Sequence, residues 1–439
     1  MTVDIAAVHL ADELMEQIRV HRLKPGMLVA SEQVLRSRHD IGRSVLRQAA
    51  RILEERGVAI MRRGSGGGLI VAEPTPEPAG RALAIVIESR MLGPKGLDRL
   101  IKANDTHVFM AATPKLDLAA CEKVRRLAVR LTGAVDDPFR HADDTRQLVA
   151  AVRGMVRDPL AGLAYQTMAE FGEDLTPYSV RLNSVELQGV WWGTLLQMVE
   201  AQIAGDVSAL FEARRRQLEV ITESQQAWST IDRDRRLIPV IEEGGAATGQ
   251  SPADRLVREL LRDVRLQGWP AGARLGGARE LMQRYKVTVG TLRQAVRTLE
   301  QHSVVRMELG RAGGLFITMP DPAAAITRAV EYLNQSDLDL ADVISFRRQL
   351  VLEAIGCAAE RKLPSVRIAA ALEGDPATLC ARLGALSGDM ALETFLAIVS
   401  TVAPHQDSPR PDSLPIVLDA LCRGDTVRAR RAFLNYDVG

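Results

Sequence analysis

Evenly spaced arginines occur at two places in the sequence, and their chemistry is that of anion recognition. Arg43, Arg47 and Arg51 follow one another at four-residue intervals, and Arg293 and Arg297 share this spacing. Four-residue spacing places side chains on one face of a helix. A guanidinium can bind a phosphate or the edge of a guanine in bidentate fashion. The spacing therefore predicts two helices with a basic face, although such a face is often only solvated.

The two arginine-bearing segments belong to a repeat within the chain. When each residue is compared with the one 246 positions later, residues 26–71 align with residues 272–317 without a gap, and about a third of the positions are identical. Such self-similarity must be identified before any fold is assigned. The chain therefore carries two copies of one unit, each followed by a longer stretch rich in Ala and Leu.

Each copy is predicted to form three helices and a β-hairpin. In the second copy, Ser251 and Pro252 have the residue types of a helix N-cap and a first helical position. A short second helix is expected near residues 31–38 and 277–284, and a third over about 42–56 and 288–302. β-Branched residues and a glycine-rich tip then predict a hairpin that ends at Val71 or Ile317.

The third helix of each copy is predicted to separate an apolar face from the basic one. A short helix and a tight turn precede it, which is the layout of a recognition helix that enters the major groove of DNA. The apolar stripe consists of Leu46, Ala50 and Leu53 in the first copy and of Leu292, Val296 and Leu299 in the second.

The glycine-rich tip of the first hairpin, GSGGG at residues 64–68, could suggest a phosphate-binding loop. It lacks a following Lys-Ser/Thr pair and stands between two strand-like runs, which disfavours nucleotide binding. A tip flanked by Arg62 and Arg63 could instead approach the sugar-phosphate backbone or the minor groove, as a wing does. A plain structural hairpin is the alternative.

Overall neutrality hides a local excess of positive charge. The chain has 56 basic and 55 acidic residues, a balance that by itself argues against a polyanionic partner. Residues 1–72 carry a charge of +3, residues 251–319 carry +6, and the remainder carries −8. The neutrality is therefore a cancellation, and the two repeat copies have the basic surface that DNA binding requires.

Composition and motifs exclude several other classes of protein. A length of 439 residues predicts about two to four domains. The sequence shows no secretory signal and no apolar run long enough for a membrane span, so a cytoplasmic location is expected. The four cysteines lack the spacing of a zinc or redox site. His107 and His141 are expected at the surface, and no nucleophile and base can be assembled from local motifs, so no enzyme is predicted.

Both copies resemble the winged helix-turn-helix domain of the GntR family of bacterial transcription regulators, over residues 23–71 (LKPGMLVASEQV to GGGLIV) and 269–317 (WPAGARLGGARE to GGLFI). Members of this family read DNA with the second helix, the start of the recognition helix and the wing. Gln33 stands where the second copy has Arg279, and Val289 stands where the first has Arg43. The resemblance implies DNA contacts by Gln33, Arg43, Ser44, Arg47, Arg62, Arg63 and Gly66 in the first copy and by Arg279, Thr291, Arg293, Arg297 and Arg311 in the second.

The stretches after the copies resemble the all-helical effector (FCD) domain of the FadR-type branch of that family, most clearly at residues 201–218, 342–361 and 419–436. Many of its members bind a metal there through an aspartate and three histidines. Here Arg146 and Gln147 follow Asp143 in place of Phe-His, and Gln217 or Tyr436 replaces the final histidine. We therefore expect neither a metal nor any other cofactor.

The expected fold class is mainly α, with two winged helix-turn-helix units each followed by a helical bundle. The expected domains are residues 1–72 and 251–319 for DNA binding and residues 80–231 and 322–439 for the helical regions, the second of them shortened, with a linker at residues 232–250.

The expected function is that of a sequence-specific transcription regulator, a repressor in its simplest form. It would act as a covalent pseudo-dimer that reads an asymmetric operator of two half-sites about one helical turn apart, or a multiple of that. A small-molecule effector would bind in a helical region, at residues that the sequence does not identify. An effector-independent architectural protein and a DNA-tethered helical enzyme are the alternatives, and further association into a homo-oligomer stays open.

Overall fold

The chain forms two compact units, and each unit combines two segments that are distant in sequence. The first unit consists of Met1–Leu92 with Gln250–Asp337, and the second of Gly93–Gly249 with Leu338–Gly439. The structure, a computed structural model, describes residues 5–62, 64, 67–90, 97–112, 118–133, 147, 151, 158–173, 185–229, 251–308, 310, 313–373, 378–403 and 414–437.

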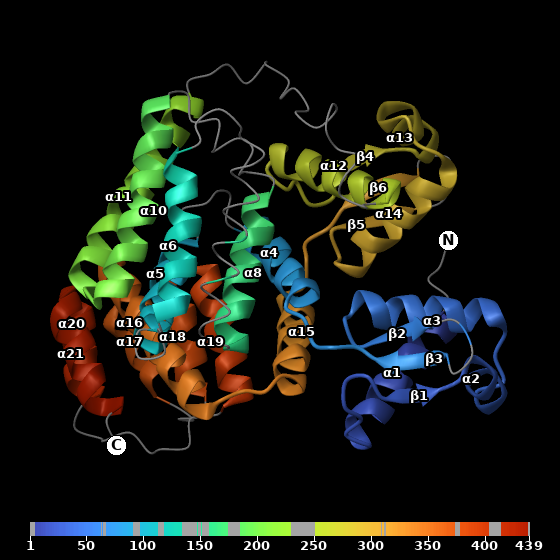
Figure 1. The fold of residues 1–439 in the computed structure, drawn as a ribbon, viewed down its shortest axis with the longest axis horizontal. Coiled ribbons are helices and arrows are strands. Elements are labelled where there is room, and N and C mark those ends of the chain that lie inside the picture. Colours follow the sequence, from blue (N-terminus) through green and yellow to red (C-terminus); the bar gives the residue numbers. More distant parts are fainter. Residues whose placement is uncertain are drawn as a thin grey trace. The chain divides into compact units, whose positions relative to one another are not determined.

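The two segments of the first unit have the same order of elements (Figure 1). The first segment contains α1 (Ile5–Val20), β1 (Leu28–Ala30), α2 (Glu32–Arg38), α3 (Arg43–Glu55), β2 (Ala59–Arg62), β3 (Gly68–Val71) and α4 (Glu77–Arg90). The second contains α12 (Pro252–Leu266), β4 (Arg274–Gly276), α13 (Ala278–Tyr285), α14 (Val289–Gln301), β5 (Val305–Glu308), β6 (Gly314–Ile317) and α15 (Pro322–Gln335).

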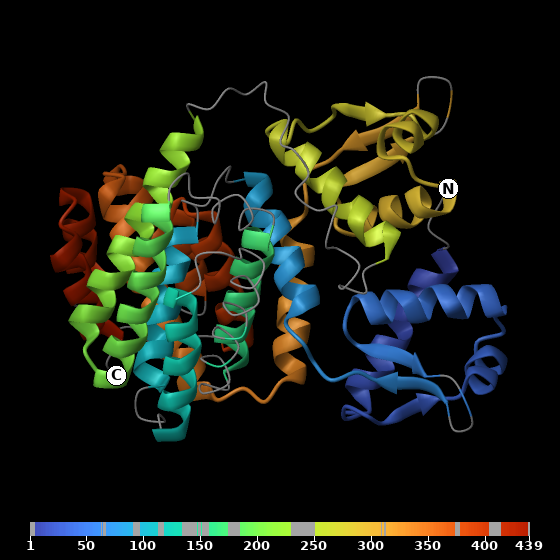
Figure 2. The same cartoon turned by 45° about the horizontal axis from the view of Figure 1, so that its top comes forward.

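Each segment contains an antiparallel sheet of three strands rather than the two-stranded hairpin expected from the sequence (Figure 2). The strand orders are β1-β3-β2 and β4-β6-β5, so the last strand lies in the centre. The added strands β1 and β4 have only three residues each and pair with strands about 40 positions later in the chain. Three residues are too few to show a periodic pattern, and pairing at that separation leaves no local signal.

The helices begin and pack as the sequence predicts. Ser251 caps α12 in a capping box with Asp254, and Pro252 is the first residue of the helix. The predicted stripes of α3 and α14 are buried at the centres of two separate hydrophobic cores. These cores fix the orientation of α3 and α14, so that Arg47 and Arg293 on the opposite faces are exposed.

The helices α4 and α15 join the two segments of the first unit. They pack against each other, and Ile85 of α4 belongs to the hydrophobic core of the second segment. The Arg265 Nε of α12 donates to Glu88 Oε2 of α4 over 2.8 Å. Because of these contacts the first unit extends beyond the boundaries at residues 80 and 322 that the sequence suggested.

The second unit is helical throughout its described residues. The helices α6, α10 and α11 run side by side (Figures 1 and 2), and α5 packs against α8 and against α16 of the later segment. The earlier segment contributes α5 (Asp98–Ala112), α6 (Leu118–Gly133), α8 (Pro159–Glu173), α10 (Val185–Ala204) and α11 (Val207–Ser229). The later one contributes α16 (Leu340–Glu360), α17 (Ser365–Leu372), α18 (Leu379–Ser387), α19 (Met390–Val402), α20 (Leu414–Arg423) and α21 (Thr426–Asp437).

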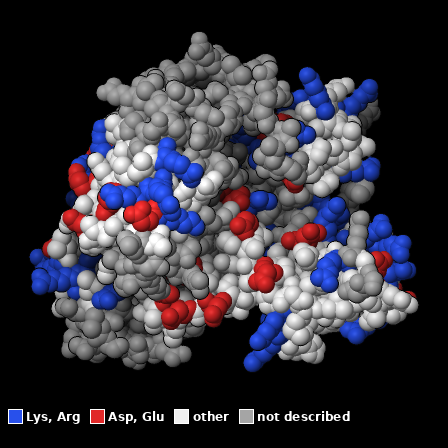
Figure 3. Space-filling view, viewed as in Figure 1, with Lys and Arg blue, Asp and Glu red and all other residues white. Residues whose placement is uncertain are grey.

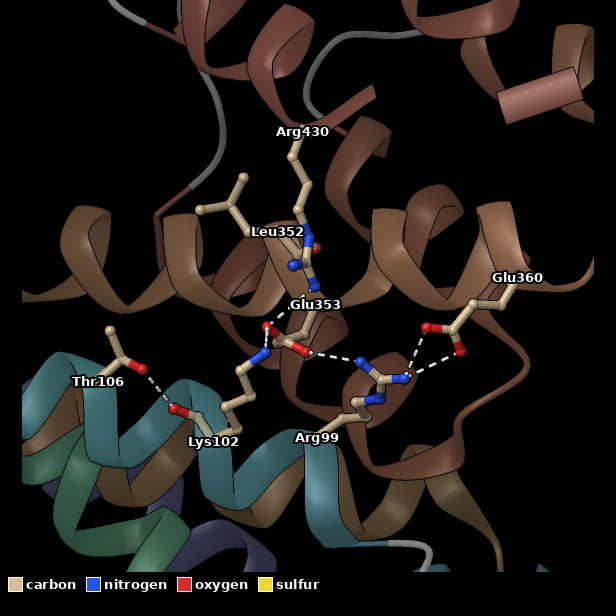
Figure 4. A network of polar contacts seen from close by, with 7 residues as sticks. All are labelled: Arg99, Lys102, Thr106, Leu352, Glu353, Glu360 and Arg430. Carbon is tan, nitrogen blue, oxygen red and sulfur yellow. Dashed lines mark hydrogen bonds and ion pairs between the residues drawn. The ribbon is translucent and has the colours of Figure 1, made fainter. Parts of the chain in front are cut away.

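A network of ion pairs joins the two segments of the second unit (Figure 4). Its centre is Glu353 of α16, whose side chain is 8% exposed. Arg99 and Lys102 of α5 approach its two oxygens at 3.1 and 3.0 Å, and Arg430 of α21 approaches at 3.1 Å. Arg99 also pairs with Glu360 at 2.9 Å. The helical regions that the sequence suggested as separate domains therefore lie in one compact unit.

Candidate nucleic-acid interface

The basic face of α3 is exposed along its length. Leu46 and Leu53 are at most 1% exposed, whereas Arg43, Arg47 and Arg51 are all exposed. The predicted separation of an apolar and a basic face is therefore confirmed for this helix. Arg43 is held at the start of α3, because its Nε donates to Glu32 Oε1 of α2 over 2.9 Å.

The corresponding helix α14 begins with a side-chain cap. The Thr288 hydroxyl accepts from the backbone N–H of Thr291 at 3.2 Å and lies 3.0 Å from the Thr291 hydroxyl. The hydroxyl of Thr291, expected to contact DNA, is therefore engaged at the helix start and is half-buried. Arg293 is exposed two residues later.

Arg297 differs from the outward-facing arginine that the sequence predicted. It is half-buried, and its Nη2 donates to Gln48 Oε1 of α3 over 3.0 Å. This bond links the two helices that the sequence identified as recognition helices. Sequence reasoning missed Gln48, because the two residues stand 249 positions apart and nothing in the local pattern marks the contact.

The second helices place Gln33 and Arg279 at equivalent positions. Each is the second residue of its helix, α2 or α13, and each is exposed. The helix α13 starts with a box in which the backbone N–H of Gly277 donates to Glu280 at 3.0 Å. This hydrogen bond, together with Arg274 and Arg284, lowers the pKa of Glu280 below its usual range. Glu280 therefore stays ionised and helps to orient the arginines around it.

The two wings differ in charge. Arg62 is exposed at the end of β2, and the equivalent position at the end of β5 is Glu308, which pairs with Arg306 of the same strand. The first wing therefore has an exposed cation at this position, whereas the second has a carboxylate whose charge is balanced by Arg306. Three other predicted contacts, Arg63, Gly66 and Arg311, lie outside the described residues.

Basic side chains gather on the first unit. Figure 3 shows Lys and Arg side chains clustered at the outer edge of the first segment, beside α3. Exposed Arg43, Ser44 and Arg47 belong to that helix. Exposed cations on a helix face have the chemistry that neutralises phosphates.

The second unit corrects one expectation. His107 is fully buried rather than at the surface, because α5 is enclosed by α8 and α16. Its Nε2 lies 2.6 Å from Asp158 Oδ2, and its Nδ1 lies 3.2 Å from the Ser345 hydroxyl. The partners come from distant parts of the chain, so no local motif predicts the burial. His141 lies outside the described residues.

The described residues contain no group of three His, Cys, Asp or Glu side chains that could hold a metal ion. Of the positions where the metal ligands were sought, Asp143 and Arg146 lie outside the described part of the chain, and Gln147 is exposed. None of the described helices is both long and apolar enough to cross a membrane.

Comparison with known proteins identifies a family for the first segment. Residues 6–68 match the model of the family described as bacterial regulatory proteins, gntR family. A structure titled Streptococcus agalactiae GntR is similar at 17% sequence identity, with a TM-score of 0.29, over 50% of this chain and 99% of that one. The comparison with curated proteins found no match. Residues 6–68 therefore form a GntR-family helix-turn-helix domain, as predicted, and this family is one of DNA-binding regulators.

Proposed function

We propose that this chain is a sequence-specific transcription regulator with two winged helix-turn-helix domains, the GntR-family domain near its N-terminus and a second over residues 251–319. The observation that carries the proposal is the repeated order of helices and strands, with an exposed arginine at the same position of α3 and α14. These residues are Arg47 and Arg293. Because both domains lie in one compact unit, a single chain acts as a covalent pseudo-dimer of the FadR type that arose by tandem duplication.

The two domains read different half-sites. Arg43 and Arg62 of the first domain have Val289 and Glu308 at their equivalent positions, whereas Arg279 of the second corresponds to Gln33. The first domain thus carries more cations at the recognition helix and wing, and the second has one at its second helix. We therefore assign an asymmetric operator, with a guanine contact for each of Arg47 and Arg293.

A small-molecule effector gates this binding from the helical unit. Asn104 of α5 is fully buried, and its amide has no hydrogen-bond partner among the described residues. Buried amides are nearly always hydrogen-bonded, which supports a ligand next to this side chain. The effector would shift the equilibrium between two placements of the DNA-binding domains, in proportion to its differential affinity for them.

The test is the affinity of the full chain for DNA selected from a random pool, compared with scrambled DNA at the same salt concentration. The proposal predicts a preference of about a thousandfold or more. Equal affinity for both would contradict it and favour an architectural protein.

For the gating, a panel of metabolites is screened by thermal unfolding. A metabolite that raises the melting temperature and changes operator affinity, with both effects lost in Asn104→Ala, supports it, and the absence of any such metabolite counts against it.

A further inference from the structure

The hydrogen bond between Arg297 and Gln48 is the feature of the first unit that the proposed function does not yet use. It joins α14 to α3 near the middle of each helix, behind the residues assigned to DNA. Arg47 and Arg293 remain exposed on the same two helices. The contact therefore connects the two reading surfaces without occupying either of them.

The contact is asymmetric with respect to the repeat. The residues equivalent to Gln48 and Arg297 are Gln294 and Arg51, so the repeat offers a second pair of the same chemistry. Both of these side chains are exposed, and the hydrogen bonds of the described residues include none between them. One of the two equivalent pairs thus forms the bond, and the other provides a matched internal control.

The contact limits the distance between the residues that read the two half-sites. The rise of a helix is about 1.5 Å per residue, so Arg43 lies about 8 Å from Gln48 along α3, and Thr291 lies about 9 Å from Arg297 along α14. Two extended side chains that share a hydrogen bond separate the backbones by at most about 14 Å. The sum of about 30 Å limits the separation between the backbones of these two residues.

The contact also resists changes in the spacing of the half-sites. One inserted base pair displaces the second half-site by about 3.4 Å and rotates it by about 35°. The hydrogen bond of 3.0 Å persists through such a displacement only if both side chains change rotamer, which costs free energy. A spacing that differs from the preferred one therefore strains or breaks this bond, or weakens the contacts of one domain with DNA.

We propose that Gln48 and Arg297 are positioning residues that fix the spacing between the two half-sites. This inference rests on the proposed function and specifies its partner, a duplex whose two half-sites have one preferred spacing. Arg297 acts through Gln48 and the placement of α14, and it does not read a base.

The experiment measures the spacing profile of the full chain, which is its affinity for DNA as a function of the number of base pairs between the half-sites. The duplex selected by the wild type is altered by inserting or deleting one, two or three base pairs between the half-sites, and affinity is measured at fixed salt. The wild type is expected to lose affinity at least 30-fold with two inserted base pairs. Gln48→Ala is expected to lose less than 5-fold over the same change, because α3 and α14 are no longer bonded to each other.

The control variants separate positioning from general damage. Gln294→Ala, at the position equivalent to Gln48, should keep the steep wild-type profile. Gln48→Glu should also keep it, because a carboxylate still accepts from Arg297. If Gln48→Ala shows the same profile as the wild type, the inference is overturned while the proposed function stands. If the wild type shows no preference for selected DNA, the proposed function fails, and the inference fails with it.

Discussion

Single arginines at the starts of α3 and α14 carry the proposed DNA recognition. We expect Arg47→Ala and Arg293→Ala each to weaken binding to the selected duplex by about 1–3 kcal/mol, because each removes a bidentate contact with a base. Equilibrium titration of a labelled duplex measures the loss. Arg19→Ala is the matched control, since Arg19 is an exposed helical arginine paired with Glu16 on α1. Undiminished affinity in both test variants would remove the third helix from the interface.

The exposed residues of the interface were predictable from the sequence, and their mutual contacts were not. Spacing alone indicated that Arg43 and Arg47 face away from Leu46, and the structure agrees. The pairing of Arg43 with Glu32 and that of Arg297 with Gln48 depend on how separate helices approach each other. Such contacts leave no periodic signal in the chain. The burial of His107 could not be predicted for the same reason.

Among the elements, the central strand of each sheet depends on a glycine at its start. A Cβ on Gly68 would lie 2.8 Å from Ser31 Cα and would also collide with the carbonyl oxygen of Ala30. We expect Gly68→Ala to lower the free energy of unfolding by about 2–4 kcal/mol, because the backbone at Ala30 and Ser31 would have to move to make room for the added atom. Gly162→Ala is the control, since nothing lies within 4 Å of the added atom in α8, and it should be neutral or stabilising by up to about 1 kcal/mol. Urea unfolding distinguishes the two, and equal values would contradict the account.

The junction between α14 and α15 contains a histidine that stays neutral. Burial, together with the cations of Arg328 and Arg81, lowers the pKa of His302 to about 3. In the unfolded chain its pKa is near 6.5, so below that pH the unfolded state binds a proton that the folded state does not. The contribution of neutral His302 to the free energy of unfolding is therefore complete above pH 6.5, and it is lost as the pH falls towards 3.

This linkage gives a pH-dependent prediction. Between pH 7 and pH 5.5 the wild type should lose about 1 kcal/mol more than His302→Gln, which has no group to protonate there. Urea titrations at the two pH values provide the measurement. Identical losses in the two proteins would show that folding does not lower the pKa of His302.

The regular elements were largely predictable, and the strands β1 and β4 were not. The helix positions followed from apolar periodicity and from the cap at Ser251. The two added strands are three residues long and are defined only by their pairing with β3 and β6. They are therefore a property of the folded sheet rather than of the local sequence.

At the scale of the whole molecule, each compact unit takes one segment from either half of the chain. In the second unit the joint includes Glu353, which three cations approach. Removal of this carboxylate in Glu353→Ala takes away the counter-charge that Lys102 and Arg430 share, whereas Arg99 keeps its pair with Glu360. We expect a loss of about 3–5 kcal/mol in the free energy of unfolding.

The control for this joint is an ion pair on the surface. Asp419 pairs with Arg423 and Arg428 within the later segment, and its side chain is 37% exposed. Asp419→Ala should cost less than about 1 kcal/mol. A loss of similar size in the two variants would show that the buried network adds nothing to the cohesion of the helical unit.

The repeat within the chain indicated a DNA-binding surface, whereas the net charge of the whole chain did not. A net charge of +1 gave no indication of a DNA-binding surface, whereas comparison of the chain with itself placed two basic segments at equivalent positions. The assembly of the units from alternating segments was not predictable, because it depends on packing such as that of Ile85 in the core of the second segment.

The central claim is that one chain reads two half-sites with two of its own domains. Hydroxyl-radical footprinting on the selected duplex, at a measured ratio of protein to DNA, tests it most directly. The account predicts one chain per duplex, with protection of one half-site weakened in Arg47→Ala and of the other half-site weakened in Arg293→Ala. Two chains per duplex, or the same half-site affected in both variants, would contradict it.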